Sequence, residues 1–300
     1  MKKPSRPLRK KKLLTLAALA LAAMLSVLSS YLCISVTRYT FETEKLTQPL
    51  RVVQLSDLHD NGLLLWQDRL LKKVEELQPD LVLITGDAVN YYTHQTSRLE
   101  AFLTSLTHLA PVYFATGNHE LGLIHTDGNE QLFQTLKQTG VQVLNDDYAD
   151  VECKGQRLRL GGLYGNVGNL WSLPQEEYRA GDLYRFLAAY EDTDRLKLLL
   201  AHRPEDLIDP NGEARWDIDL AFCGHEHGGQ VRLPFLGGFY SSHLGWFTPY
   251  LEGAKRIGGV PAVISRGLGS YVWKSKGIMI PPRFWNPPEI VAVDLLPKGS

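Results

Sequence analysis

Apolar residues in the first half of the chain alternate between short continuous runs and stretches with helical spacing. Continuous runs of this length are typical of buried strands, and the spaced ones are typical of amphipathic helices. In chain order they predict strand 50–55, helix 63–77, strand 81–85, helix 99–109, strand 112–116, helix 131–139 and strand 141–144. Strands that alternate with helices predict a parallel sheet.

The second half of the chain has strand-like runs with few helices between them. These runs predict six further strands at 157–163, 196–201, 218–223, 230–233, 260–265 and 289–295. The main helical pattern in this half covers residues 176–190. A second sheet packed on the first accommodates these strands best. We therefore expect one folded domain over residues 50–300.

The amino-terminal segment has a different pattern. Residues 13–37 contain no charged side chain, whereas residues 1–12 contain seven basic residues and no acidic one. A helix over these 25 residues, rising ~1.5 Å per residue, would cross the ~30 Å hydrocarbon layer. Because basic residues stay on the cytoplasmic side, everything after the span should lie outside the cytoplasm. A cleaved signal peptide and a buried core helix are the alternatives.

Residues 38–49 are polar and end at Pro49, which predicts a linker between the membrane anchor and the folded domain. Fully extended, a linker of this length would keep the domain within ~35 to 40 Å of the bilayer.

Charge and cysteine content exclude several classes of protein. The formal net charge is −1, and it becomes −8 without the basic amino-terminal cluster. A body with this balance is not suited to bind a nucleic-acid polymer, which requires a concentrated basic face. The three cysteines lie outside CxxC spacing, so neither a disulfide scaffold nor a zinc knuckle is indicated.

Polar clusters follow the first three core strands and two later ones. The clusters are Ser56-Asp57-Leu58-His59, Thr85-Gly86-Asp87, Thr116-Gly117-Asn118-His119-Glu120, Ala201-His202-Arg203-Pro204 and Gly224-His225-Glu226-His227. Open α/β sheets place their sites at these strand ends. Carboxylate, imidazole and amide oxygen together suit Mn, Fe or Zn, and the absence of thiolates argues against a structural zinc site. Each cluster alone is more typical of an ordinary turn or helix cap, but five in this order indicate a metal centre.

In these five blocks the sequence resembles the calcineurin-like metallophosphoesterases, over residues 50–295. The later stretches 227–238, 265–269 and 283–290, together with the membrane segment, resemble the bacterial membrane-associated branch, some of whose members are assigned as UDP-2,3-diacylglucosamine hydrolases or general phosphodiesterases. The resemblance implies an α+β or α/β fold, a four-layer αββα sandwich preceded by one transmembrane helix. It also implies a centre of two divalent ions, Mn, Zn or Fe.

The resemblance assigns a role to each matching residue. One ion would be held by Asp57, His59 and His227, the other by Asn118, His202 and His225, with Asp87 bridging both. A water shared by two such ions is acidic enough to act as hydroxide and attack phosphorus. His119 is then the candidate donor that protonates the leaving group or stabilises the transition state.

One position departs from the pattern of superfamily phosphatases. They often place an acid three residues after the bridging Asp, where it pairs with the catalytic histidine, and an arginine follows it. This chain has Asn90 and Tyr91 at these positions. Asn90 could orient the histidine or contact substrate, but an amide cannot stabilise imidazolium charge as a carboxylate does. A protein-phosphatase activity is therefore disfavoured.

Two further features have alternative interpretations. Arg266 follows a strand and either contacts a substrate phosphate or forms a surface ion pair. The aromatic stretch 235–250 is either ordinary loop packing or an apolar lip that accommodates an acyl or prenyl group.

These features leave two functional hypotheses. The first is a membrane-anchored phosphoesterase with a lipid-linked phosphodiester or pyrophosphate substrate, and glycerophosphodiesters and cyclic nucleotides as alternatives. The second is a catalytically silent, membrane-tethered module that binds metal or phosphate. The complete set of ligands favours the first hypothesis, because a silent relative usually loses a ligand or the proton donor.

Overall fold

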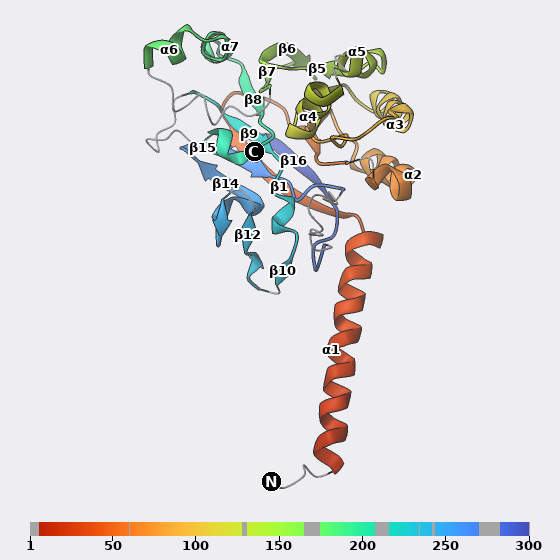
Figure 1. The fold of residues 1–300 in the computed structure, drawn as a ribbon. Helices are drawn as coiled ribbons and strands as arrows, with labels where there is room; N and C mark the ends of the chain where they lie inside the picture. The colour runs from red at the N-terminus through yellow and green to blue at the C-terminus, as the bar shows by residue number, and fades with distance from the viewer. Residues whose placement is uncertain are drawn as a thin grey trace.

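The structure is a computed structural model that describes residues 6–59, 61–127, 131–164, 175–207, 216–233, 235–241, 244–269 and 283–299. Helix α1 (Arg6–Leu32) projects as a single rod from a body of two packed sheets (Figure 1). It contains one segment long and apolar enough to cross a membrane, Lys10–Ser30, of which only 11% is buried. The alternative of a buried core helix is therefore wrong.

The first sheet has six strands in the order β1-β16-β2-β3-β4-β5. Its strands are β1 (Ser35–Thr43), β2 (Leu50–Leu55), β3 (Leu81–Thr85), β4 (Val112–Ala115), β5 (Gln142–Val143) and β16 (Glu289–Pro297). The helices that follow them are α2 (Asn61–Leu77), α3 (Ser97–Thr107), α4 (Asn118–Asp127) and α5 (Gln131–Gln138). Strands β2 to β5 are parallel, as the alternation of strands and helices predicts.

The second sheet also has six strands, in the order β14-β15-β9-β8-β7-β6. Its strands are β6 (Asp147–Cys153), β7 (Gln156–Gly162), β8 (Leu196–Leu200), β9 (Leu220–Cys223), β14 (Gly253–Ile257) and β15 (Val260–Ile264). The expected helix at 176–190 is two helices, α6 (Gln175–Ala180) and α7 (Asp182–Glu191), with Gly181 between them. The 3₁₀ turns are η2 (Pro204–Leu207), η3 (His227–Gly229) and η4 (Pro249–Leu251).

Three apolar cores separate the layers. In β2, Val53 and Leu55 face the helices of the first sheet, whereas Leu50 and Val52 face the second sheet. Successive residues of a strand point to opposite faces, so a strand buried on both sides is apolar throughout. A third core lies between the second sheet and α7. The fold is thus a sandwich of helices, sheet, sheet and helices, and the expected αββα architecture is confirmed.

The expected linker over residues 38–49 is wrong, because its first half belongs to the sheet as part of β1. Strand β1 pairs in parallel with β16, from Ser35 opposite Glu289 to Thr43 opposite Pro297. Tyr39 and Phe41 alternate with polar residues and pack against the core between the sheets. Alternation of apolar and polar residues is typical of an edge strand. The many polar residues of this segment hide that pattern in the sequence. The folded body therefore begins at Ser35, before the expected Leu50.

The apolar helix ends before residue 37, the expected end of the membrane span. Helix α1 ends at Leu32, and Ile34 is already buried in the core beneath the first sheet. Cys33 and Ile34 alone connect the helix to β1, a link of about 7 Å when extended.

Residues 230–233 do not join the second sheet as expected. They contribute β10 (Arg232–Leu233), which pairs with β11 (Gly237–Gly238). Strand β12 (Tyr240–Ser241) pairs next with β13 (Gly245–Trp246). We call these two hairpins, residues 231–247 where described, the small lobe. It projects from the body on the same side as α1 (Figure 1).

Candidate metal centre

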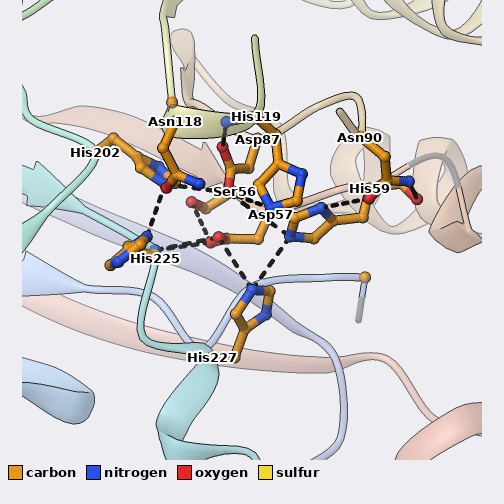
Figure 2. Close-up of polar contacts among 12 residues, drawn as sticks. Ser56, Asp57, His59, Asp87, Asn90, Asn118, His119, His202, His225 and His227 are labelled. Atoms are coloured by element: carbon orange, nitrogen blue, oxygen red, sulfur yellow. Dashed lines mark hydrogen bonds and ion pairs between the residues drawn. The ribbon is translucent and has the colours of Figure 1, made fainter. Parts of the chain in front are cut away.

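The polar clusters meet at one edge of the sandwich, where the strands of both sheets end. Five of the clustered residues have a left-handed backbone, with φ between 48° and 70°: Asp57, His59, Asp87, His225 and His227. This conformation is uncommon for residues with a side chain and concentrates at functional sites. It turns the chain sharply after each strand, so that the side chains point at a common centre (Figure 2).

The first group of candidate ligands comprises Asp57, His59 and His227. One possible ligand atom from each lies within 4.8 Å of the others, and all three residues are buried. His59 Nε2 is 3.2 Å from His227 Nε2, which in turn is 3.5 Å from Asp57 Oδ1. These three residues come from the ends of β2 and β9, so the site joins the two sheets.

The second group comprises Asp87, His202 and His225, again within 4.8 Å of one another. His202 Nε2 lies 3.2 Å from Asp87 Oδ2, from Asn118 Oδ1 and from His225 Nδ1. Asp87 Oδ2 is also 3.8 Å from His59 Nε2 of the first group. Asp87 therefore lies between the two groups (Figure 2).

The donor set fits two divalent cations. Pairs of imidazole nitrogens face each other at 3.2 Å in both groups, and two such nitrogens share at most one proton. A cation that accepts both lone pairs suits this arrangement, and carboxylate and amide oxygens complete a set without thiolates. The structure thus brings together all seven residues expected as ligands: Asp57, His59, Asp87, Asn118, His202, His225 and His227.

The electrostatics of the centre agree with a cation site. Burial lowers the pKa of both His59 and His119 to about 4, so both imidazoles are neutral near pH 7. Burial alone would also lower the pKa of His202, but the Asp87 carboxylate raises it to about 10. Cation binding at His202 would therefore release a proton.

Glu120 fixes the loops that carry the centre, a role that sequence analysis did not assign. Its carboxylate accepts hydrogen bonds from the backbone N–H groups of Asp87, Val89 and Gly117, at 2.9, 3.1 and 2.7 Å. Burial, followed by the charge of Asp87, raises its pKa to about 7. Gly117 is required beside it, because a Cβ there would lie 2.2 Å from Asp87 Oδ1.

Asn90 contacts His59, a candidate metal ligand. Its Oδ1 lies 3.0 Å from His59 Nδ1, and its Nδ2 donates to the His59 carbonyl at 2.8 Å. A hydrogen bond at the outer ring nitrogen fixes the tautomer and direction of a ligating histidine. His202 has the equivalent contact through Nδ1, 2.7 Å from the Thr85 carbonyl.

His119 lies beside Asp87 at the edge of the centre. Its backbone N–H donates to Asp87 Oδ1 at 2.8 Å, and its Nε2 is 3.9 Å from Asp87 Oδ2. The ring of Tyr91 stacks on the imidazole with centroids 3.9 Å apart. The Tyr91 hydroxyl accepts from Asn118 Nδ2 at 2.8 Å, so this side chain supports both His119 and a candidate ligand.

Arg266 forms a buried ion pair, one of its two expected alternatives, although not at the surface. Its guanidinium donates to Glu289 Oε1 at 2.9 Å and to Ser35 Oγ at 3.1 Å. Ser35 belongs to β1 and Glu289 to β16, so Arg266 links the amino-terminal edge strand to its neighbour in the sheet. The structure thus shows the ion pair, and a contact between Arg266 and a substrate phosphate stays a prediction.

Residues 50–229 match the family model described as "Calcineurin-like phosphoesterase". The chain belongs to this family, and it is a hydrolase of phosphoester bonds.

Two relatives agree with this family assignment. The chain is 30% identical over 226 residues to "Phosphodiesterase YaeI" of Escherichia coli K12, and the match covers 74% of this chain and 76% of that protein. It is 31% identical over 190 residues to "Transmembrane protein with metallophosphoesterase domain" of Danio rerio, covering 61% of this chain and 41% of that protein. Among solved structures, a 5'-nucleotidase precursor from Thermus thermophilus superposes with a TM-score of 0.46 at 18% identity, over 83% of this chain and 54% of the other.

Proposed function

We propose that this protein is a membrane-anchored phosphodiesterase with two divalent cations, and that its substrate is a lipid-linked phosphodiester or pyrophosphate such as UDP-2,3-diacylglucosamine. The observation that carries the proposal is the short connection between α1 and β1. Only Cys33 and Ile34 separate the apolar helix from the catalytic body. A site held this close to the bilayer encounters substrates embedded in it.

Uncleaved anchorage is supported by contacts between α1 and the body. Ser26 Oγ and Ser30 Oγ accept hydrogen bonds from the backbone N–H groups of Trp285 and Asn286, at 2.7 and 3.0 Å. A cleaved signal peptide would not keep these contacts. The basic residues before the span favour a cytoplasmic amino terminus and an extracytoplasmic body.

In the proposed reaction, Asp57, His59 and His227 would hold one cation and Asn118, His202 and His225 the other, and Asp87 would contribute to both sites. When bound, such ions acidify water and stabilise charge on the phosphoryl oxygens. His119 contributes a hydrogen bond to the leaving oxygen. Because burial keeps its imidazole neutral, we favour a neutral donor that stabilises developing charge over full proton transfer.

The proposal predicts that anchored enzyme prefers substrate in its own bilayer. With the full chain in vesicles, UDP-2,3-diacylglucosamine in the same vesicles should be hydrolysed ~10²-fold faster than the same amount in separate vesicles, because tethering raises the effective concentration. A water-soluble chromogenic diester serves as the control. Its rate of hydrolysis should be the same in both vesicle preparations. Equal rates for the lipid in both arrangements would contradict the lipid-linked proposal, and no hydrolysis of either substrate would favour a silent module.

The orientation predicts the outcome of protease treatment. Protease added to intact spheroplasts should digest the body after α1, because the basic residues keep the amino terminus in the cytoplasm. A cytoplasmic protein should survive in the same sample and control for lysis. Protection of the body until lysis would show the opposite topology.

A further inference from the structure

Large apolar side chains stand exposed beside the anchor. We define the apolar rim as Phe235, Leu236, Trp246, Phe247 and Trp285. The first four belong to the small lobe, and Trp246 and Phe247 are 66% and 79% exposed. Trp285 precedes β16 in sequence, and its neighbour Phe284 pairs with the lobe through backbone hydrogen bonds to Gln230 and Arg232. Exposed apolar groups of this size mark interaction surfaces.

The rim lies at the level where α1 would leave the membrane. The segment Lys10–Ser30 has 21 residues, and a helix of that length is about 31 Å long, close to the hydrocarbon thickness. Ser26, about one turn before the end of this segment, binds the backbone N–H of Trp285. The small lobe, which carries four of the five rim residues, projects from the same side of the body as α1 (Figure 1).

The chemistry of the small lobe suits the boundary between lipid headgroups and acyl chains. Residues 233–251 contain no Asp, Glu, Lys or Arg, so no charge would be desolvated there. The flanking charges, Arg232 and Glu252, pair with each other at 2.5 Å. Tryptophan and other amphipathic aromatic rings are enriched at this depth of a bilayer.

Three residues of the rim adopt a backbone conformation that costs free energy. Phe235, Phe247 and Trp285 all have a left-handed backbone, with φ of 67°, 58° and 47°. Bulky residues adopt this region rarely, and such outliers concentrate where function requires them.

We propose that the apolar rim is a second membrane contact that inserts into the phospholipid interface beside the end of α1. The proposal rests on the proposed anchorage by α1. The lobe also packs on the turn that carries His227, because a Cβ at Gly229 would lie 2.9 Å from the Tyr240 carbonyl. Asn286, next to Trp285, donates to the His227 carbonyl at 2.6 Å. Insertion of the rim therefore sets the orientation of the metal centre towards the bilayer.

Quenching of tryptophan fluorescence by brominated phospholipid tests this contact. The full chain, which has six Trp, is placed in phosphatidylcholine vesicles with or without bromine on the acyl chains. Helix α1 contains no Trp, so it contributes no signal of its own. We expect bromolipid to quench the wild type, and the Trp246→Phe/Trp285→Phe double variant to lose most of this quenching.

Trp216→Phe is the matched control. Trp216 is half-buried against Tyr184 on the far side of the second sheet, and its replacement should leave quenching by bromolipid unchanged. Hydrolysis of a soluble diester reports that each variant is folded.

The outcomes separate this proposal from the one on which it rests. Vesicle flotation reports anchorage by α1. If the protein floats but the double variant is quenched like the wild type, the rim does not enter the interface, and the proposal is overturned while anchorage stands. Protein that fails to float would overturn the anchorage and the membrane contact together.

Discussion

Replacement of Asp87 by Asn is expected to abolish hydrolysis of a soluble phosphodiester, to below about one thousandth of the wild-type rate. Asp87 Oδ2 lies 3.2 Å from His202 and 3.8 Å from His59, one residue from each ligand group. An amide keeps the shape and the hydrogen bond from the His119 N–H, but it removes the negative charge that two cations would share. Steady-state kinetics on the purified full chain in detergent measures the loss.

Asp294→Asn is the matched control for this substitution. Asp294 lies in β16 and pairs with Arg51 at 2.6 Å, with both side chains about one third exposed. Exposed pairs of this kind contribute little to stability, so the control should keep its activity within about twofold. Wild-type activity in Asp87→Asn would show that Asp87 holds no ion needed for hydrolysis.

Replacement of His119 by Asn should reduce turnover by about 10² to 10⁴-fold while leaving the metal content unchanged. The imidazole borders the centre, where it stacks on Tyr91. Asn keeps a donor but places it on a shorter side chain, away from the leaving oxygen. The kinetics should show a fall in kcat with little change in KM, because the contact is made mainly in the transition state.

Metal analysis of the His119→Asn protein separates the two roles open to this residue. A lost ion would identify His119 as a ligand, an assignment that its position within 4.8 Å of His59 and Asp87 also allows. Undiminished turnover would remove it from the mechanism altogether.

That the candidate ligands lie together could be predicted from the sequence, because the physical rule behind their position is local. A buried strand is recognised by its apolar run, and the polar residues after parallel strands must meet at one edge of the sheet. Asp57, His59 and Asp87 satisfy this rule within a few residues of their strands. The two-sheet architecture followed from the same runs.

What the sequence did not reveal depends on partners distant along the chain. Strand β1 has few apolar residues, and its pairing with β16 joins residues more than 250 positions apart. Arg266 could not be assigned without Glu289, and the role of Asn90 depends on the direction in which His59 turns. Glu120 binds backbone N–H groups, which leave no pattern in the side chains.

The metal content of the purified chain tests the two-cation centre most directly. After loading with Mn and removal of free ion, elemental analysis should give close to two ions per chain for the wild type and fewer than one for Asp87→Asn. Chelation should abolish hydrolysis of the soluble diester, and added Mn should restore it as the second ion binds. One ion or less per wild-type chain at full activity, or equal metal content in both proteins, would contradict the account.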